Sequence, residues 1–168
     1  MSPEKILSID QLLKVLEQLR VTGMGVVFTN GCFDLLHVGH VRYLANARLL
    51  GDVLVVALNG DASVRALKGD GRPINPAGDR AEVQAALEVV NFVTVFDSPR
   101  VTEVIKELRP DIYVKGGDYT VESLDPGERA ALEEVGTEIR IVPIMPGKST
   151  TSLIEKMESA GAGMAKRN

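Results

Sequence analysis

The fold of this chain is decided by Thr29-Asn30-Gly31-Cys32-Phe33-Asp34-Leu35-Leu36-His37-Val38-Gly39-His40. An apolar run, residues 25–28, precedes this stretch and is short enough to be a buried parallel strand. Residues 41–50 follow it and end at Gly51, a pattern that predicts a helix with a glycine stop. The stretch is therefore predicted to be the turn between a buried strand and a helix.

This turn has the features of a phosphate-binding site. Its glycines let backbone N–H groups approach a ligand closely, and the start of the following helix favours negative charge. His37 and His40, the only histidines in the chain, are three residues apart, so one helical turn places both on the same face. A lone histidine or a glycine turn is common in α/β proteins, whereas H-x-G-H directly after a strand and a G-C-F-D turn is far more specific.

The composition limits the classes of protein to which the chain can belong. It has 168 residues, of which 45% are hydrophobic and 25% charged, as is ordinary for one soluble domain with its own core. A net charge of −4 without a basic block gives no indication of nucleic acid or an anionic membrane as partner. The N-terminus lacks the apolar core of a signal peptide, and the longest apolar run, 53–58, is too short to span a bilayer. We expect a single cytoplasmic domain, 1–168, with a helical extension at 1–23 and a disordered tail at 159–168.

Cys32 is the only cysteine, so an intrachain disulfide and a multi-cysteine metal site are excluded. The thiol lies in the predicted phosphate turn, but no adjacent base stands ready to activate it as a nucleophile. We interpret it as a small packing residue.

Strands and helices alternate along the chain. Residues 8–11 have capping-box form, and apolar residues then recur at helical spacing; this stripe fits the chain's own sheet, the commoner outcome, or a partner subunit. A helix through Arg80, capped by Asn75 with Pro76 in its first turn, is predicted to bury Val83, Ala86, Leu87 and Val90. The other predicted strands are 53–58, 92–96, 111–114 and 138–142, and the other helices are 62–67, 101–108 and 125–136.

This alternation predicts an α/β fold, a doubly wound Rossmann-like sheet of five mainly parallel strands in the order 3-2-1-4-5. In such a sheet ligands bind where the strand order reverses, beside strand one. The glycine-rich exits of strands one and four, Asn30-Gly31 and Gly116-Gly117, are neighbours in this order. The turn chemistry and the topology therefore predict the same crevice.

The H-x-G-H turn resembles that of the HxGH nucleotidylyltransferase superfamily, the cytidylyltransferase-like branch in particular. In that family the two histidines hold a triphosphate and stabilise the transition state as a nucleotidyl group passes to a substrate phosphate. The resemblance implies catalytic roles for His37 and His40, together with Lys68 on a glycine-flanked loop and Arg80 on a helix, because cations neutralise the developing phosphoryl charge.

The same resemblance implies further binding residues. Ser149, Thr150 and Thr151 could simply cap a last helix, but the family places a similar S-T-T against nucleotide phosphates. Substrate contacts are implied for Asn59, Asp61 and Arg72. Mg²⁺ is expected to arrive on the nucleotide phosphates, since no cluster of metal ligands stands out. The implied nucleotide-binding residues are Thr29, Asn30, Gly31, Cys32, Phe33, Gly39, Lys115, Gly117, Asp118, Ser149, Thr150 and Thr151.

Within the superfamily, three segments (68–73, 115–119 and 149–151) are most similar to adenylyltransferases that act on a heptose 1-phosphate. The resemblance implies transfer of AMP from ATP to D-glycero-β-D-manno-heptose 1-phosphate, giving ADP-heptose, a precursor of lipopolysaccharide or another cell-surface glycan, and pyrophosphate. Some cytidylyltransferases carry an arginine a few residues before the S-T-T, and 144–148 has none. In many bacteria this unit is fused to a sugar kinase, and we expect a separate kinase to supply the phosphate here.

Other functions stay open. A CTP-dependent enzyme acting on glycerol 3-phosphate or a similar polyol phosphate would use the same phosphate groups. A redox Rossmann protein is a weaker alternative, because strand one is not followed by G-x-G-x-x-G. A non-catalytic nucleotide sensor would keep the glycine turns but has no need of both histidines. The resemblance and the apolar N-terminal helix together predict a homodimer.

Overall fold

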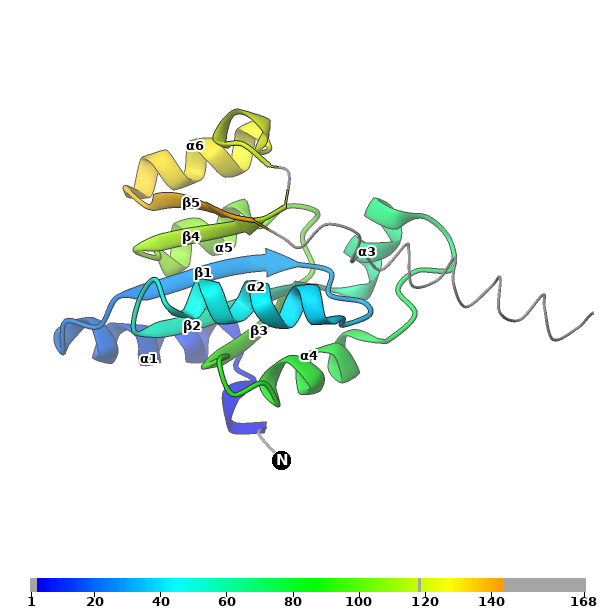
Figure 1. The fold of residues 1–168 in the computed structure, drawn as a ribbon, viewed down its shortest axis with the longest axis horizontal. Coiled ribbons are helices and arrows are strands. Elements are labelled where there is room, and N and C mark those ends of the chain that lie inside the picture. Colours follow the sequence, from blue (N-terminus) through cyan, green and yellow to red (C-terminus); the bar gives the residue numbers. More distant parts are fainter. Residues whose placement is uncertain (1–2, 118, 144–168) are drawn as a thin grey trace, which may run out of the picture.

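The computed structural model describes residues 3–117 and 119–143. It contains one five-stranded sheet of order β3-β2-β1-β4-β5 in which every neighbouring pair is parallel (Figure 1). The predicted doubly wound α/β fold is confirmed. The strands are β1 (Val26–Gly31), β2 (Val53–Asn59), β3 (Phe92–Phe96), β4 (Ile112–Gly116) and β5 (Glu138–Val142).

Of the six α-helices within the described ranges, five cover the two faces of the sheet, and α3 lies beyond the carboxyl ends of the strands (Figure 1). Buried side chains of α1, α5 and α6 pack together on one face, and those of α2 and α4 on the other. All seven residues of β2 are buried, as expected of a central parallel strand covered on both faces. The helices are α1 (Ile9–Val21), α2 (Val38–Arg48), α3 (Asp61–Lys68), α4 (Ala77–Ala85), α5 (Thr102–Leu108) and α6 (Pro126–Val135), with short 3₁₀ turns η1 (Pro3–Lys5) and η2 (Val121–Ser123).

The two central strands that flank the reversal of strand order pair unequally along their lengths. β1 pairs with β2 through six residue pairs, from Val26 to Gly31. It pairs with β4 only at Val27 and Phe28, before the carboxyl ends of both strands. Beyond that point side chains, rather than backbone groups, connect the exits of β1 and β4. The sheet therefore leaves room for polar side chains at the place where the topology predicts a ligand.

Helix α1 is an integral part of the domain. Ser8 and Gln11 form the predicted capping box. Leu12 and Leu16 are fully buried in the core cluster that contains α5, so the apolar stripe packs within the chain. The face of α1 that carries Leu12 and Leu16 therefore packs against the chain's own core and is not available to a partner subunit.

The predicted packing of α4 was wrong for Val83 and Ala86, which are exposed, whereas Val90 is buried and Leu87 packs against the core as predicted. Pro76, not Asn75, occupies the N-cap position, and Val83 is half exposed. The helix ends at Ala85. Ala86, Leu87 and Val90 therefore lie beyond its last residue and do not share one helical face with Val83. The buried face of α4 consists of Arg80, Ala81, Gln84 and Ala85.

The N-terminal segment covers the edge of the sheet at β3. Ile6 bridges to Val93 in parallel, and the Leu7 N–H donates to the Val93 carbonyl at 2.9 Å. Lys5 Nζ donates to the carbonyls of Leu87 and Val90 just before the strand. The outer side of β3 is therefore partly paired.

Within the described ranges, no helix is long and apolar enough to cross a bilayer. The predicted tail at 159–168 lies outside the described residues.

We predict that Leu16→Ala lowers the free energy of unfolding by about 2–5 kcal/mol, because it leaves a cavity in the core. Urea denaturation would measure the loss. Val21→Ala is the matched control, since Val21 is on the same helix and 88% exposed, and it should change stability by no more than about 0.5 kcal/mol. Equal, small effects of the two substitutions would show that α1 is a detachable extension.

Candidate active site

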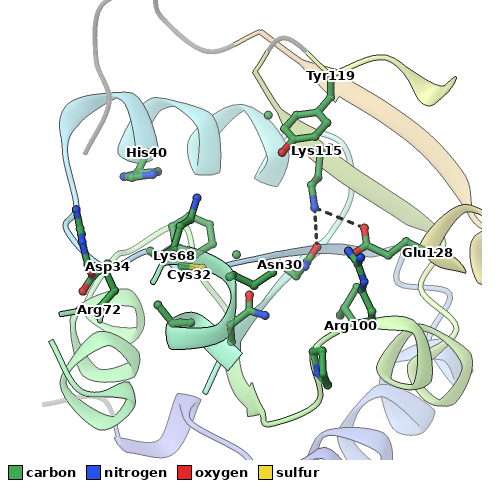
Figure 2. Close-up of a pocket in the computed structure, with 18 of the residues that line it drawn as sticks. Asn30, Cys32, Asp34, His40, Lys68, Arg72, Arg100, Lys115, Tyr119 and Glu128 are labelled. Carbon is green, nitrogen blue, oxygen red and sulfur yellow. Dashed lines mark hydrogen bonds and ion pairs between the residues drawn. The ribbon is translucent and has the colours of Figure 1, made fainter. Parts of the chain in front are cut away.

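A cavity of about 590 Å³ lies at the carboxyl ends of β1, β2 and β4. Figure 2 shows His40 and Lys68 toward one end, and Lys115, Arg100 and Glu128 toward the other. The position is the crevice predicted from the topology. Nine of the predicted site residues line the cavity: Asn30, Gly31, Cys32, Phe33, His40, Asn59, Lys68, Arg72 and Lys115.

The two histidines stand together at the start of α2. His37 is the N-cap residue, and its ring stacks on that of His40 with centroids 3.9 Å apart and planes 24° from parallel. Burial, with a further contribution from nearby His37, lowers the pKa of His40 from 6.5 to about 4. The His40 imidazole is therefore neutral at pH 7 and can donate one N–H, while bound phosphates would raise its affinity for a second proton.

The turn between β1 and α2 is closely packed. A Cβ atom on Gly31 would lie 2.9 Å from a ring carbon of Phe33, so the residue must be glycine for the ring to sit there. Phe33 itself has a positive φ of 44°, and its ring lies against His40 with centroids 5.2 Å apart. The Phe33 ring thus packs against His40 within the cavity wall and limits where the imidazole can lie.

Asp34, the last residue of the G-C-F-D turn, anchors the loop between α3 and α4. Its carboxylate accepts hydrogen bonds from Arg72 Nη1 at 2.8 Å and from the backbone N–H groups of Ile74 and Asn75. Burial alone would raise the pKa of this carboxyl, but the three donors outweigh it and hold the pKa below its usual range. Arg72 therefore lines the cavity from a fixed position. Asp34 was not among the predicted site residues, although it ends the G-C-F-D turn.

Arg80 lies beneath the cavity and does not line it. The side chain is 2% exposed, and its guanidinium donates to the carbonyls of Cys32, Asn59 and Asn75 and to the carboxylate of Asp61. Arg80 thus holds together the segments that carry the site, and Asp61 faces Arg80. Arg80, which was predicted to be catalytic, and Asp61, which was predicted to bind substrate, are not among the residues that line the cavity.

Other expected residues also lie away from the cavity lining. Thr29 is fully buried, and its hydroxyl forms a 2.7 Å hydrogen bond with Tyr43, which donates in turn to the carbonyl of Val114. Gly39 is buried within α2, and Gly117 follows β4 outside the lining set. Asp118, Ser149, Thr150 and Thr151 lie outside the described residues.

Lys68 and Cys32 both line the cavity. Lys68 is the last residue of α3, capped by Gly69, and not part of the loop where it was expected. Its ammonium is exposed and close enough to act on Cys32 electrostatically. Burial nevertheless raises the pKa of the Cys32 thiol, so the protonated thiol packs in the wall and is a poor nucleophile.

A hydrogen-bonded cluster joins the exits of β1 and β4 to α6. Tyr113 Oη donates to Asn30 Oδ1 at 2.7 Å, and Lys115 Nζ donates to the same oxygen at 3.3 Å. Glu128 Oε2 lies 3.2 Å from Tyr113 Oη and 3.6 Å from Lys115 Nζ. Because Asn30 Oδ1 accepts from two donors, its Nδ2 group is the donor left for the cavity. Glu128 was missed because nothing in the local sequence of a surface-type helix distinguishes it from a solvated glutamate.

The carboxylates of this region are held by protein donors. Within residues 3–117 and 119–143, no group of three or more His, Cys, Asp or Glu side chains is arranged to hold a metal ion. Asp34 and Glu128, which line the cavity, are already bonded to arginine, lysine or tyrosine. These carboxylates therefore fit a Mg²⁺ ion that is bound by nucleotide phosphates better than one that the protein binds directly.

A parallel α/β sheet with a stacked histidine pair over a glycine turn is the arrangement of a nucleotidylyltransferase. The chain belongs to the cytidylyltransferase-like family, whose model matches residues 28–156. This finding confirms the resemblance inferred from the H-x-G-H turn.

Its curated relatives include bifunctional HldE proteins. The HldE protein of Campylobacter fetus subsp. fetus (strain 82-40) is 48% identical over 92% of this chain, and that of Geotalea uraniireducens (strain Rf4) is 48% identical over 94%. The chain spans only about a third of the length of these relatives, 31% and 32%.

Two solved structures are also similar. The lipopolysaccharide core biosynthesis protein from Thermoplasma volcanium GSS1 is 31% identical with a TM-score of 0.61, over 73% of this chain and 98% of that one. Pantoate-beta-alanine ligase from Francisella tularensis is 14% identical with a TM-score of 0.56, over 84% of this chain and 68% of that one, and shares the fold alone.

We predict a pH dependence of stability that arises from His40. Its pKa is about 4 in the folded chain against an ordinary 6.5, so between these values the unfolded chain binds a proton that the folded chain does not. Stability therefore falls as the pH drops from 6.5 toward 4. Urea unfolding at pH 7 and pH 5 should show a larger loss for the wild type than for His40→Gln. The same loss in both proteins would contradict the neutral, buried imidazole.

Proposed function

We propose that this chain transfers AMP from ATP to a sugar phosphate, D-glycero-β-D-manno-heptose 1-phosphate, and forms ADP-heptose and pyrophosphate. This proposal rests on the stacked rings of His37 and His40. It is supported by the 48% identity between nearly the whole chain and part of the HldE proteins. ADP-heptose would then serve as a precursor of lipopolysaccharide or a related cell-surface glycan.

In the proposed reaction a phosphate oxygen of the acceptor attacks the α-phosphorus of ATP. The bond from that phosphorus to the bridging oxygen of the β-phosphate breaks, and pyrophosphate leaves with the electron pair. Both reactants are anions, so the main tasks are in-line positioning and neutralisation of charge. His37, His40 and the N-terminus of α2 would hold the phosphates, and Lys68 would add a positive charge from the end of α3.

Arg80 would support this chemistry from beneath. Its guanidinium binds the carbonyls of Cys32 and Asn59, so it fixes the turn and the exit of β2 at the cavity floor. Its contribution would be structural positioning and a positive potential under the phosphates, not a direct hydrogen bond. Mg²⁺ would enter on the nucleotide phosphates, where it would neutralise their charge, and the reaction would take place in the cytoplasm.

A substrate panel tests the proposal. ATP and CTP are each combined with heptose 1-phosphate, glucose 1-phosphate and glycerol 3-phosphate, and pyrophosphate release is measured. We expect ATP with heptose 1-phosphate to be preferred, because a hydrogen-bonding base pocket discriminates by orders of magnitude. His40→Ala should lower kcat by roughly 10²–10³ while the thermal midpoint stays near that of the wild type. His37→Ala should behave alike.

A preference for CTP with glycerol 3-phosphate would replace the proposed substrates by the cytidylyltransferase alternative. ATP binding without pyrophosphate release under any acceptor would indicate a nucleotide sensor. Full activity of His40→Ala would remove the histidine pair from the mechanism.

We also propose a homodimer, supported by the family resemblance. The apolar stripe of α1 no longer supports it, since Leu12 and Leu16 are buried within the domain. Sedimentation velocity at micromolar concentration should show a species about twice the 18.1 kDa of the chain, and a monomer alone would reject the proposal.

A further inference from the structure

The cavity continues past Lys115 into a second lobe of about 300 Å³. The lobe lies between the turn after β3, which carries Arg100, and the start of α6, which carries Glu128. The main cavity and the lobe adjoin, because four residues line both of them: Arg100, Lys115, Tyr119 and Glu128. In Figure 2 these side chains gather at the end of the cavity opposite His40 and Lys68.

The lobe carries charged groups of both signs at fixed positions. Glu128 is 7% exposed, and its Oε2 atom meets Tyr113 and Lys115. Both of these contacts are made by Oε2, so Oε1 is the oxygen that can accept a hydrogen bond from a ligand. Arg100 is 57% exposed, and its Nη1 atom pairs with Asp125 at 3.1 Å, which steers the guanidinium along the rim of the lobe. One carboxylate oxygen and several N–H donors are therefore available to a ligand.

The Glu128 carboxylate and the Arg100 guanidinium are suited to bind two neighbouring hydroxyls of one ligand. A hydroxyl donates one hydrogen bond and accepts others, so a pair of hydroxyls can donate to a carboxylate and accept from a guanidinium at once. A purine would instead require stacking on aromatic faces. Among the described residues the lobe has one aromatic ring, Tyr119, which is 47% exposed and has the Lys115 ammonium 5.6 Å from its centroid. The lobe fits a polyol better than a base.

We propose that this lobe holds the polyhydroxylated ring of the acceptor, with Glu128 accepting from and Arg100 donating to its hydroxyls. The assignment rests on the proposed transfer to a sugar phosphate. Lys115, which the resemblance assigned to the nucleotide, lies at the junction of the lobe and the main cavity and would instead contact the acceptor phosphate, whose attacking oxygen points toward the histidine end. Arg100 and Glu128 are the residues that select the acceptor.

The test measures KM for each substrate in Arg100→Gln and Glu128→Gln. With ATP saturating, each variant should raise KM for heptose 1-phosphate about tenfold, the effect of one charge-assisted hydrogen bond. KM for ATP should change by less than about twofold. Preference for heptose 1-phosphate over glycerol 3-phosphate should shrink, since the smaller acceptor lacks the ring hydroxyls that the lobe contacts.

Arg129→Gln is the matched control. Arg129 follows Glu128 on α6, is exposed, pairs with Glu133 at 2.8 Å and does not line the cavity or the lobe. It should keep both KM values. Thermal unfolding of all three variants checks that the fold is intact, and Arg100→Gln remains informative even if loss of Glu128 destabilises the core.

Calorimetric titration of heptose 1-phosphate in the absence of ATP separates this inference from the proposed function. Weaker binding to Arg100→Gln than to wild type supports the lobe even if the wild type turns over another substrate pair. Equal binding to both, or a raised KM for ATP with an unchanged KM for the acceptor, overturns the assignment while the proposed reaction stands. Absence of turnover by the wild type with heptose 1-phosphate refutes the proposed function instead.

Discussion

The buried guanidinium of Arg80 is the interaction on which the rest of the site depends. Burying a charge is costly unless it is fully hydrogen-bonded, and here the cost is offset by three carbonyls and one carboxylate. Those partners belong to the turn after β1, the exit of β2, the start of α3 and the loop before α4. A single side chain therefore sets the relative positions of the turn after β1, the junction between β2 and α3, and the loop before α4. Loss of the guanidinium would leave several carbonyls without a donor in the protein interior.

The cavity is electrostatically uneven along its length. At the H-x-G-H end the His40 imidazole is neutral at pH 7, and positive charge comes from Lys68 and the start of α2. At the far end Lys115 is balanced by Glu128. A phosphate is therefore attracted most strongly to the histidine end, while the balanced end favours groups that hydrogen-bond without net charge. This difference gives a bound sugar phosphate one preferred direction in the crevice.

The sequence was informative wherever one local rule decided the structure. Short, mainly apolar runs predicted β1 to β4, the alternating residues 138–142 predicted β5, and the alternation of strands and helices predicted the strand order. The spacing of His37 and His40 predicted that they lie on one face, and in the structure their rings stack. Arg80 and Thr29 were harder, because the direction of a side chain depends on which face of its element the tertiary structure buries. Glu128 reaches the site through its hydrogen bond to Tyr113 on β4, and β4 pairs with β1 between residues 85 positions apart, a contact that no local pattern indicates.

The pairing of the N-terminal segment with β3 bears on how this domain avoids unwanted association. An outer strand of a parallel sheet presents unpaired N–H and C=O groups, which are a template for another chain. Ile6 and Leu7 occupy part of that template on β3, and Lys5 places an ammonium beside it. Residues 5–7 thus cover part of the β3 edge and oppose its pairing with a strand of another molecule. A shortened chain that begins at α1 would keep its cavity and its histidines, yet lose solubility through an edge that this chain keeps covered.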